Sequence, residues 1–368
     1  MEKDMKNDQS KPGNSEFSAS TRYTDLVNLG RAPHQHHGFI NIPVYHGSTV
    51  LFPSTKAFIE YKQEYTYSRA GTPTSRNFEN AVAKLEGGFG SVLCPSGLSA
   101  ISTSLLAFLQ NGDHLLMADT AYQPTRKLCD TFLPKLGIET TYYDPLIGGD
   151  IEKLMKSNTR VIYTESPGSH TMEIQDIPAI AEAAHHRQAT VICDNTWATS
   201  LYYDVLKLGV DVSVQAVTKY ISGHSDLMMG AVTAGDEKHF TALKSTHKVL
   251  GLYVGGDDIN LAARGLRTLR LRLERHMKNG IAVAEWLKGR EEVEEVLHPA
   301  LAGAAGHDIW KRDFDGAGSL FSVRLKSFSD EAVFAMLDHL EHFGIGESWG
   351  GFESLVIPFN PSDYRTVG

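Results

Sequence analysis

Cysteine is scarce in this sequence, and long hydrophobic runs are absent. The 368 residues include three cysteines, which lie far apart in or near apolar segments: Cys94, Cys129 and Cys193. An odd number of cysteines without a Cys-x-x-Cys pair argues against a disulfide framework and a zinc site, and it favours a reducing compartment. No apolar run approaches the length of a membrane span. The sequence therefore predicts a soluble, cytoplasmic protein that does not enter a membrane.

Positive charge is in deficit. The chain has 35 lysines and arginines against 44 aspartates and glutamates, a net charge of −9. With no basic stripe, this balance argues against binding to nucleic acid or to an anionic membrane surface. A histidine cluster at 34–37 lies in a loop flanked by proline and glycine, without nearby carboxylates or thiols. It therefore predicts no metal site.

The chain is longer than a single hydrophobic core usually allows, so two domains are expected. Residues 1–20 are polar, lack the apolar core of a signal peptide and predict a disordered tail. Residues 21–65 are rich in glycine, proline and histidine and predict an arm that contacts a neighbouring subunit. From 66 to 254, strand and helix patterns alternate, as in a doubly wound sheet. The remainder, 255–368, predicts a smaller C-terminal α/β domain.

A long helical pattern near 259–286 opens the C-terminal part. It carries four arginines close together: Arg264, Arg267, Arg270 and Arg272. A row of guanidinium groups is most simply placed on a solvated surface. We therefore expect this row on a face exposed to solvent or to another subunit.

Two polar residues follow apolar runs that read as strands. Asp194 closes the run 189–193, and Lys219 follows the run 211–218. The interval between them has room for a turn, a short helix and a second strand, so it predicts one βαβ crossover. Both residues would then lie at the carboxyl ends of parallel strands, where α/β sheets place their chemistry. A lysine amine and a carboxylate there are the two groups that pyridoxal phosphate needs, one for the covalent link and one to keep the ring nitrogen protonated.

The spacing of Asp194 and Lys219 alone does not establish a site for pyridoxal phosphate. A lysine just past a strand is usually a solvated charge, and an aspartate there is most often a turn or cap residue. Upstream, the segment 90–109 predicts a strand, a Pro-Ser-Gly turn and a helix, whose first N–H groups can bind a phosphate. Many α/β proteins contain such turns. This one matches neither a Walker A loop nor G-x-G-x-x-G, so a nicotinamide-binding unit is disfavoured.

Three further side chains could belong to a cofactor site. Tyr122 follows the predicted strand 114–118 and could stack on a planar ring, or be an ordinary half-buried tyrosine. Tyr67 and Arg69 lie two apart in a turn-rich segment. The planar fork of an arginine suits a phosphate, although a lone arginine in a loop is usually a surface residue.

Together these segments resemble the Cys/Met-metabolism family of pyridoxal-phosphate enzymes, from Tyr23 to about Tyr364. The resemblance implies a fold type I, transferase-like large domain with a mostly parallel, doubly wound sheet, followed by the smaller α/β domain. It implies pyridoxal 5'-phosphate as cofactor, with Lys219 as the covalently bonded lysine and Asp194 as the partner of the ring nitrogen. Tyr122 resembles the tyrosine that stacks on the ring and takes a proton from the incoming amine.

The resemblance also implies how the phosphate is held. Gly97 and Leu98 match the backbone amides on the phosphate, and Thr218 matches its hydroxyl donor. Tyr67 and Arg69 match a pair that reaches the phosphate of the neighbouring subunit, which implies a homo-oligomer, commonly a dimer of dimers. One position departs: Ala216 stands where the family often has serine, which removes one hydrogen bond at a cost of about 1 kcal/mol.

Two stretches point to the β-lyase branch of the family. Gly168-Ser169 stands where γ-synthases and γ-lyases usually have Thr-Asn-Pro, and Trp349, after Ser348, stands where they usually have leucine. Ser348 and Trp349 are expected to bind the substrate, with Trp349 narrowing the pocket, and the alternative for Trp349 is a core tryptophan beside a glycine turn. The branch implies cleavage of L-cystathionine, or another cysteine S-conjugate, to a thiol, pyruvate and ammonia in methionine biosynthesis. A γ-synthase or γ-lyase, a cofactor-binding protein with little lyase activity and a non-enzymatic scaffold stay open.

The end of the sequence complicates this interpretation. The resemblance places the arginine for the substrate carboxylate in a strand beyond the Tyr-Arg-Thr segment, and this sequence ends at Gly368. Arg365 belongs to the earlier segment, so the carboxylate role is not transferred to it. We therefore expect either a truncated small domain with weakened substrate binding or another residue in this role.

Overall fold

The computed structural model describes residues 19–367, so the predicted tail at 1–20 lies almost entirely outside the described residues. Its centre is a seven-stranded sheet with the order β1-β7-β6-β5-β4-β2-β3. The strands are β1 (Gly90–Cys94), β2 (His114–Ala118), β3 (Glu139–Tyr143), β4 (Thr159–Glu165), β5 (Thr190–Asp194), β6 (Val212–Gln215) and β7 (Gly230–Ala234). β7 runs antiparallel to both of its neighbours, and the other pairs are parallel. The predicted mostly parallel sheet is confirmed.

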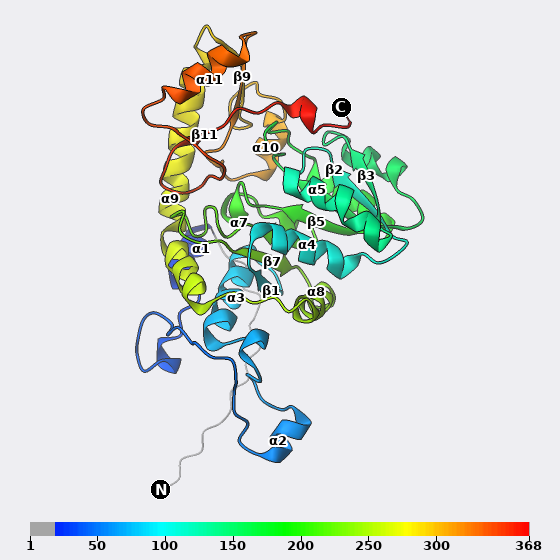
Figure 1. The fold of residues 1–368 in the computed structure, drawn as a ribbon, viewed down its shortest axis with the longest axis vertical. Helices are drawn as coiled ribbons and strands as arrows, with labels where there is room; N and C mark the ends of the chain where they lie inside the picture. The colour runs from blue at the N-terminus through cyan, green and yellow to red at the C-terminus, as the bar shows by residue number, and fades with distance from the viewer. Residues whose placement is uncertain (1–18, 368) are drawn as a thin grey trace.

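Helices cover both faces of the sheet, as Figure 1 shows. One face packs against α3 (Pro73–Glu86), α6 (Ile177–His186), α7 (Thr199–Tyr202) and α9 (Gly256–Lys288). The other packs against α4 (Gly97–Phe108), α5 (Gln123–Thr131) and α8 (Glu237–Val249). Side chains alternate between the two layers, so Leu116 belongs to the first core and its neighbours Leu115 and Met117 to the second. Because both faces are covered, the central strands are apolar without alternation.

The C-terminal part stands on the far end of α9, at the top of Figure 1. It contains β8 (Val293–Leu297) antiparallel to β9 (Ser322–Leu325), and β10 (Gly344–Ile345) parallel to β11 (Leu355–Val356). Two helices complete it, α10 (His307–Asp313) and α11 (Asp330–Asp338). The N-terminal segment holds α1 (Ala19–Asn28) and α2 (Thr55–Glu60), and the arm with α2 extends away from the rest. None of the helices in the described range 19–367 combines the length and apolar character needed to cross a membrane.

Two of the four arginines expected on a face exposed to solvent or to another subunit donate hydrogen bonds to main-chain carbonyls of this chain. Arg272 donates hydrogen bonds to the carbonyl oxygens of Tyr220 (2.6 Å) and Gly265 (2.8 Å). Arg267 donates to the carbonyl of Val27 (2.7 Å). Burial lowers the pKa of Arg272 to about 10. Main-chain carbonyls left without partners need donors, and α9 supplies them to the segment that directly follows Lys219.

A buried carboxyl group joins α3 to the strand that leads to Lys219. Glu86 accepts hydrogen bonds from the hydroxyl of Ser213 (2.7 Å) and the side-chain amide of Gln215 (2.9 Å). The same amide donates to the carbonyl of Asn195 at 3.0 Å. Burial raises the pKa of Glu86 to about 7, although the Ser213 donor opposes the shift. The folded chain therefore binds this proton more tightly than the unfolded chain does.

Glu86→Gln is expected to flatten the dependence of stability on pH. A carboxyl group with a raised pKa contributes most stability below its unfolded value of 4.5 and loses it as the pH rises to about 7. The free energy of unfolding of the parent should therefore fall between pH 5 and pH 8 by up to about 3 kcal/mol more than that of the variant. Denaturant unfolding of both proteins without cofactor measures this difference. Equal pH dependence of the two proteins would contradict the prediction.

Candidate active site

The loops that leave β1, β2, β4, β5 and β6 meet at one edge of the sheet. Asp194 is the last residue of β5, and Lys219 follows the end of β6. The two strands are parallel neighbours, with Cys193 opposite Ser213, and α7 and a 3-10 helix (Val205–Leu208) lie between them in the chain. The predicted βαβ crossover is confirmed. The run predicted as a strand to position 218 turns out of the sheet after Gln215.

The side chain of Lys219 meets a loop from the C-terminal part. Its Nζ donates a hydrogen bond to Oγ of Ser348 at 2.6 Å and lies 5.3 Å from the ring centroid of Trp349. The loop approaches closely because Gly350, with φ of +83°, has no side chain: a Cβ there would lie 3.1 Å from the backbone nitrogen of Tyr220. Burial lowers the pKa of Lys219, while the charges of Asp194 and Glu347 act in the opposite direction.

Asp194 faces a second buried carboxyl group. Its Oδ1 accepts the N–H of Thr196 (3.0 Å) and the hydroxyl of Thr196 (2.6 Å). Glu165, the last residue of β4, lies opposite Asp194 in the parallel register. Burial raises the pKa of both groups, and the charge of Asp194 raises that of Glu165 further. The sheet therefore places two interacting carboxyl groups at the edge where Lys219 lies.

Tyr122 lies beside these carboxyl groups, with its ring partly exposed. Its N–H donates to Oε2 of Glu165 at 2.8 Å, and the residue is 44% exposed. Burial raises the pKa of the Tyr122 hydroxyl, and the charges of Glu347, Glu165 and Asp194 add to the effect. The phenol is therefore protonated near neutral pH.

The start of α4 presents backbone N–H groups that are free within residues 19–367. Ser96 caps the helix by accepting the N–H of Ser99 at 3.1 Å. In the part of the chain that the structure describes, the N–H groups of Gly97 and Leu98 have no hydrogen-bond partner. A Cβ on Gly97 would lie 2.8 Å from the Cβ of Ala216, so only glycine fits there. The hydroxyl of Thr218 is engaged at the start of β7, where it accepts the N–H of Met229 (2.9 Å) and donates to its carbonyl (3.1 Å).

Gly97→Ala is expected to weaken binding of pyridoxal phosphate about tenfold, because the new methyl group overlaps Ala216 and displaces the helix start. Titration of the protein with the cofactor, followed by quenching of tryptophan fluorescence, measures the dissociation constant. Adding Ala216→Gly removes the overlapping atom and should restore affinity. Binding by the double variant that is as weak as that of Gly97→Ala would show that the contact is not responsible.

Tyr67 and Arg69 are not brought to this group of residues within one chain. Arg69 donates to the carbonyl of Lys248 at 3.0 Å, and Tyr67 is 45% exposed. No contact within residues 19–367 joins either side chain to Lys219, Asp194 or Tyr122. Their role toward a neighbouring subunit stays a prediction.

Glu165 and Glu347 were not singled out from the sequence. Glu165 ends a strand, as Asp194 does, so the same rule of polar residues at strand ends could have found it. Glu347 directly precedes Ser348, and its charge acts on both Lys219 and Tyr122. The sequence alone does not show that the strand ending at Glu165 is the neighbour of the strand ending at Asp194, or that the loop with Glu347 approaches Lys219.

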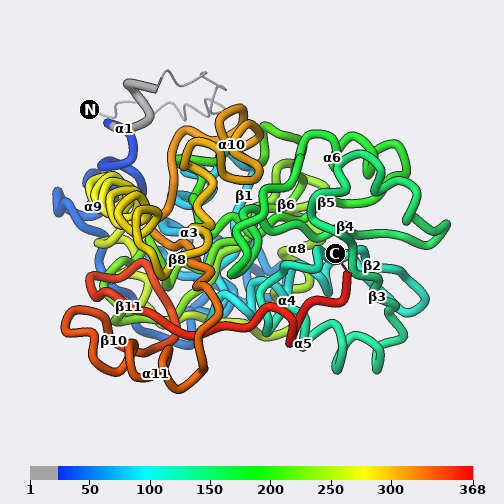
Figure 2. The backbone as a smooth tube through the Cα atoms, turned by 90° about the horizontal axis from the view of Figure 1, so that it is seen from above, coloured from blue at the N-terminus to red at the C-terminus, as the bar shows by residue number. Residues whose placement is uncertain are grey.

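The C-terminal segment docks beside Tyr122, and Figure 2 shows its end lying next to β2 and α5. Arg365 donates to Oδ2 of Asp119 (2.8 Å) and to Oε2 of Glu173 (2.9 Å), and Arg126 donates to Oδ1 of Asp119 (2.7 Å). Burial alone would raise the pKa of Asp119, but donors from Thr366 and its neighbours outweigh burial and lower it. Arg365 thus binds two carboxylates of its own chain. This agrees with the decision to give it no role in binding the substrate carboxylate.

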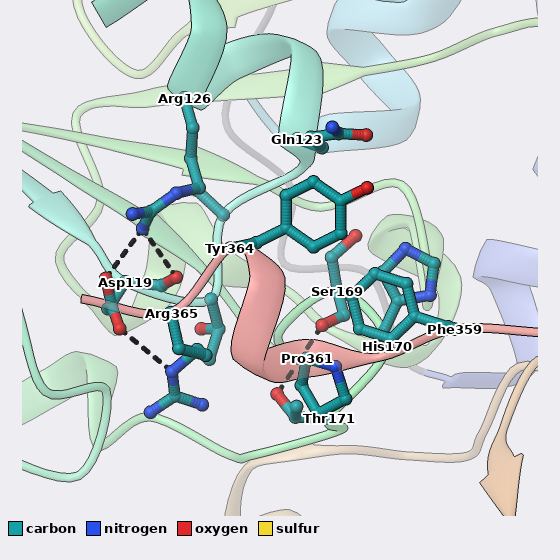
Figure 3. A pocket seen from close by; sticks show the side chains of 12 residues that line it. Asp119, Gln123, Arg126, Ser169, His170, Thr171, Phe359, Pro361, Tyr364 and Arg365 are labelled. Atoms are coloured by element: carbon teal, nitrogen blue, oxygen red, sulfur yellow. Dashed lines mark hydrogen bonds and ion pairs between the residues drawn. The ribbon is translucent and has the colours of Figure 1, made fainter. Parts of the chain in front are cut away.

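A small cavity lies between this segment and the loops after β2 and β4 (Figure 3). Its lining includes Asp119, Arg126, Ser169, His170, Tyr364 and Arg365. The ring of His170 stacks on Phe359, with 3.6 Å between the ring centroids. The residues on both sides of Tyr122 in the segment 119–123 line this cavity, whereas Lys219 and Asp194 do not.

The group around Lys219 fits pyridoxal phosphate. A lysine amine, a buried carboxylate and a helix start with unpartnered N–H groups match the aldehyde, the ring nitrogen and the phosphate. The missing side chain at Gly97 leaves room for the phosphate to approach the main chain.

Comparison with known proteins points to one enzyme family. The family model described as Cys/Met metabolism PLP-dependent enzyme matches residues 23–366. Cystathionine beta-lyase MetC of Escherichia coli is 41% identical over 352 residues, which cover 94% of this chain and 89% of that protein. The crystal structure of cystathionine gamma synthase from Xanthomonas oryzae pv. oryzae in complex with cystathionine has 33% identity and a TM-score of 0.86, covering 93% of this chain and 86% of that one. Cystathionine gamma-lyase from Lactobacillus plantarum complexed with L-serine has 28% identity and a TM-score of 0.86, covering 91% and 86%.

These relatives share the fold and differ in the reaction that their names state. The family model spans nearly all of the described residues, including the sheet edge with Lys219 and Asp194. The chain belongs to the Cys/Met metabolism family of PLP-dependent enzymes, and its cofactor is pyridoxal 5'-phosphate.

Proposed function

We propose that the protein is a carbon–sulfur β-lyase that cleaves L-cystathionine, or another cysteine S-conjugate, to homocysteine or the corresponding thiol, pyruvate and ammonia, in the metabolism of methionine. The observation that carries this proposal is the contact between Lys219 and the loop at Ser348-Trp349, which places the branch-specific tryptophan ring 5.3 Å from the lysine amine. The 41% identity to an enzyme named cystathionine beta-lyase also supports it.

Each side chain has a role that its surroundings support. Pyridoxal phosphate, when bound, supplies an electron sink for the carbanion formed at the substrate Cα. The amine of Lys219 takes the proton from Cα and delivers a proton to the departing sulfur, and its lowered pKa gives more of the neutral base near pH 7. Asp194 holds the proton on the ring nitrogen. Tyr122 would pack its ring against the cofactor, and its raised pKa keeps the phenol protonated before substrate binds.

The loop after β4 supports the β-lyase branch. Gly168 lies directly against the side chain of Thr120, where any larger residue would collide. The N–H of Ser169 donates to the carbonyl of Thr120 at 2.8 Å. The Gly-Ser pair therefore holds this loop close to the segment that carries Tyr122. An Asn-Pro pair could not make the same packing, because proline lacks the N–H.

Two alternatives have support of their own. Similar solved structures include a γ-synthase and a γ-lyase, which favours a γ-type reaction. The commitment of Arg365 to Asp119 and Glu173 leaves no arginine assigned to the substrate carboxylate, which favours a cofactor-binding protein with little lyase activity.

Product analysis separates these functions. The visible spectrum of the purified protein with pyridoxal phosphate is recorded before and after addition of L-cystathionine, and the products are identified. Pyruvate with homocysteine is the expected result. 2-Oxobutyrate with cysteine would show the γ-type reaction, and a cofactor band without products would show a protein that binds the cofactor without lyase activity.

The proposal includes a homo-oligomer in which residues 21–65 contact a neighbouring subunit and Tyr67 and Arg69 reach its phosphate. Large apolar side chains of this arm are exposed in the single chain, with Leu51 85% and Ile59 76% exposed. Apolar surface of this kind is typical of an interface. Light scattering of the cofactor-bound protein is expected to give the mass of a dimer or tetramer, and a monomer with full cofactor occupancy would contradict the proposal.

A further inference from the structure

We propose that Glu165 is a positioning residue of this active site: it anchors the main chain of Tyr122 and, standing beside Asp194, leaves the negative charge of the pair on Asp194. The kinetic test of this inference rests on the proposed function, because it measures turnover of L-cystathionine. The spectroscopic test needs only bound pyridoxal phosphate. Glu165 itself contacts neither Lys219 nor the loop at 348–349 through a hydrogen bond in the described part of the chain.

The first step is the anchoring of Tyr122. Glu165 is 9% exposed and ends β4, one strand away from the loop after β2 that carries Tyr122. Its Oε2 accepts the N–H of Tyr122 at 2.8 Å. Tyr122 is the N-cap residue of α5, yet its side chain makes no capping bond, and the residue is 44% exposed. The bond to Glu165 is therefore the polar contact that fixes the entry of this residue into the helix.

The second step is the link to the loop after β4. Glu165 accepts the N–H of Tyr122, and the polar groups of Ser169 lower the pKa of Glu165 against the effect of burial. The N–H of Ser169 in turn donates to the carbonyl of Thr120, two residues before Tyr122. The loop that carries Tyr122 is thus tied to β4 through Glu165 and to the loop after β4 through Ser169.

The third step is the division of charge between the two carboxyl groups. Glu165 and Asp194 are opposite in register on neighbouring strands, so ionising both costs repulsion in a buried place. Asp194 has two donors from Thr196 and feels the charge of Lys219. Burial, and then the charge of Asp194, raises the pKa of Glu165 well above its usual range. The proton therefore lies on Glu165 and the charge on Asp194.

The other titratable groups around the pair do not reverse this division. They are Tyr122, Tyr163, Cys193, Lys219 and Glu347. Burial raises the pKa of the phenols of Tyr122 and Tyr163 and of the Cys193 thiol, which keeps all three neutral near pH 7. Lys219 is the one cation among these groups, and its charge acts on Asp194. The pair of carboxyl groups thus carries one negative charge, on Asp194, where the cationic ring nitrogen is expected.

The test compares Glu165→Gln with Glu165→Ala. The glutamine is neutral and keeps an oxygen for the N–H of Tyr122, so kcat should stay close to the parent value. The alanine frees Tyr122, and kcat should fall by about 10²-fold with a smaller change in KM, as expected for a misplaced group. In Glu165→Gln, the pH at which the absorption band of the bound cofactor changes should equal that of the parent.

The matched control is Asp113, a buried carboxylate at the opposite end of β2 that accepts the N–H of Gln110 at 2.9 Å. Asp113→Asn and Asp113→Ala report the general effect of altering such a group and should leave the cofactor band and its pH dependence unchanged. The inference is overturned if Glu165→Ala keeps the parent kcat or if Glu165→Gln loses as much kcat as Glu165→Ala. It is also overturned if the cofactor band of Glu165→Gln changes at a different pH from that of the parent.

Failure of the proposed function gives a separate result. If the parent releases no pyruvate from L-cystathionine, the lyase proposal fails. The absorption band and its pH dependence still decide the inference about Glu165, because they need only the bound cofactor.

Discussion

Lys219→Ala is expected to reduce release of pyruvate from L-cystathionine by about 10³-fold or more, because the variant loses both the covalent link to the cofactor and the base at the substrate Cα. The amine lies at the sheet edge, 2.6 Å from Oγ of Ser348, with its pKa lowered by burial. No other lysine is placed beside Asp194 by the contacts in residues 19–367. The measurement is steady-state pyruvate formation with pyridoxal phosphate in excess, together with borohydride reduction and peptide mapping of the labelled lysine.

Lys244→Ala is the matched control for this variant. Lys244 is also a partly buried lysine whose pKa is lowered by burial, and its Nζ also lies 5.3 Å from an aromatic ring, that of Phe240. It is in α8, away from the sheet edge with Lys219 and Asp194. The control should keep the parent rate and the borohydride label. Loss of the label from Lys244→Ala, or its persistence in Lys219→Ala, would mean that the cofactor is bonded elsewhere.

The parts of the site that follow strands could be predicted from the sequence. Asp194 and Lys219 each follow an apolar run, and the length between the runs fits only a short crossover, so their meeting at one edge is a consequence of local patterns. Gly97 follows the same logic, since a strand, a turn and a helix are readable over 90–109. These predictions depend on the periodicity of apolar residues within segments of about 30 residues.

Contacts between distant segments could not be predicted in this way. Ser348 reaches Lys219 across 129 residues, and Gly350 makes that approach possible. Glu165 acts on Asp194 only because β4 and β5 are neighbours in the sheet order. Arg272 looked like a surface charge on a helix, yet it binds carbonyl groups of the segment after Lys219. Each case depends on which elements pack together, and periodicity in one segment does not specify its partner.

Asp194→Asn is expected to lower turnover of L-cystathionine by about 10²- to 10³-fold, because a neutral amide cannot hold the proton on the ring nitrogen of the cofactor. The amide oxygen can still accept the two hydrogen bonds from Thr196, so the local geometry should persist. Burial raises the pKa of Asp194, which means that its charge costs folding free energy. The cofactor-free variant should therefore be at least as stable as the parent at pH 8, and thermal unfolding checks this.

Asp211→Asn separates the role of Asp194 from a general effect of losing a carboxylate on these two strands. Asp211 lies at the amino end of β6, where its Oδ2 accepts the N–H of Val191 (2.8 Å) and contacts Nε2 of His185 (3.1 Å). It is at the sheet edge opposite to Asp194 and Lys219, so its amide variant should turn over L-cystathionine at the parent rate. A similar loss in both variants, or a loss below tenfold for Asp194→Asn, would assign the protonated ring nitrogen to another partner. With a large loss confined to Asp194→Asn and no loss of stability, the carboxylate acts in the reaction and not in the folding of the sheet.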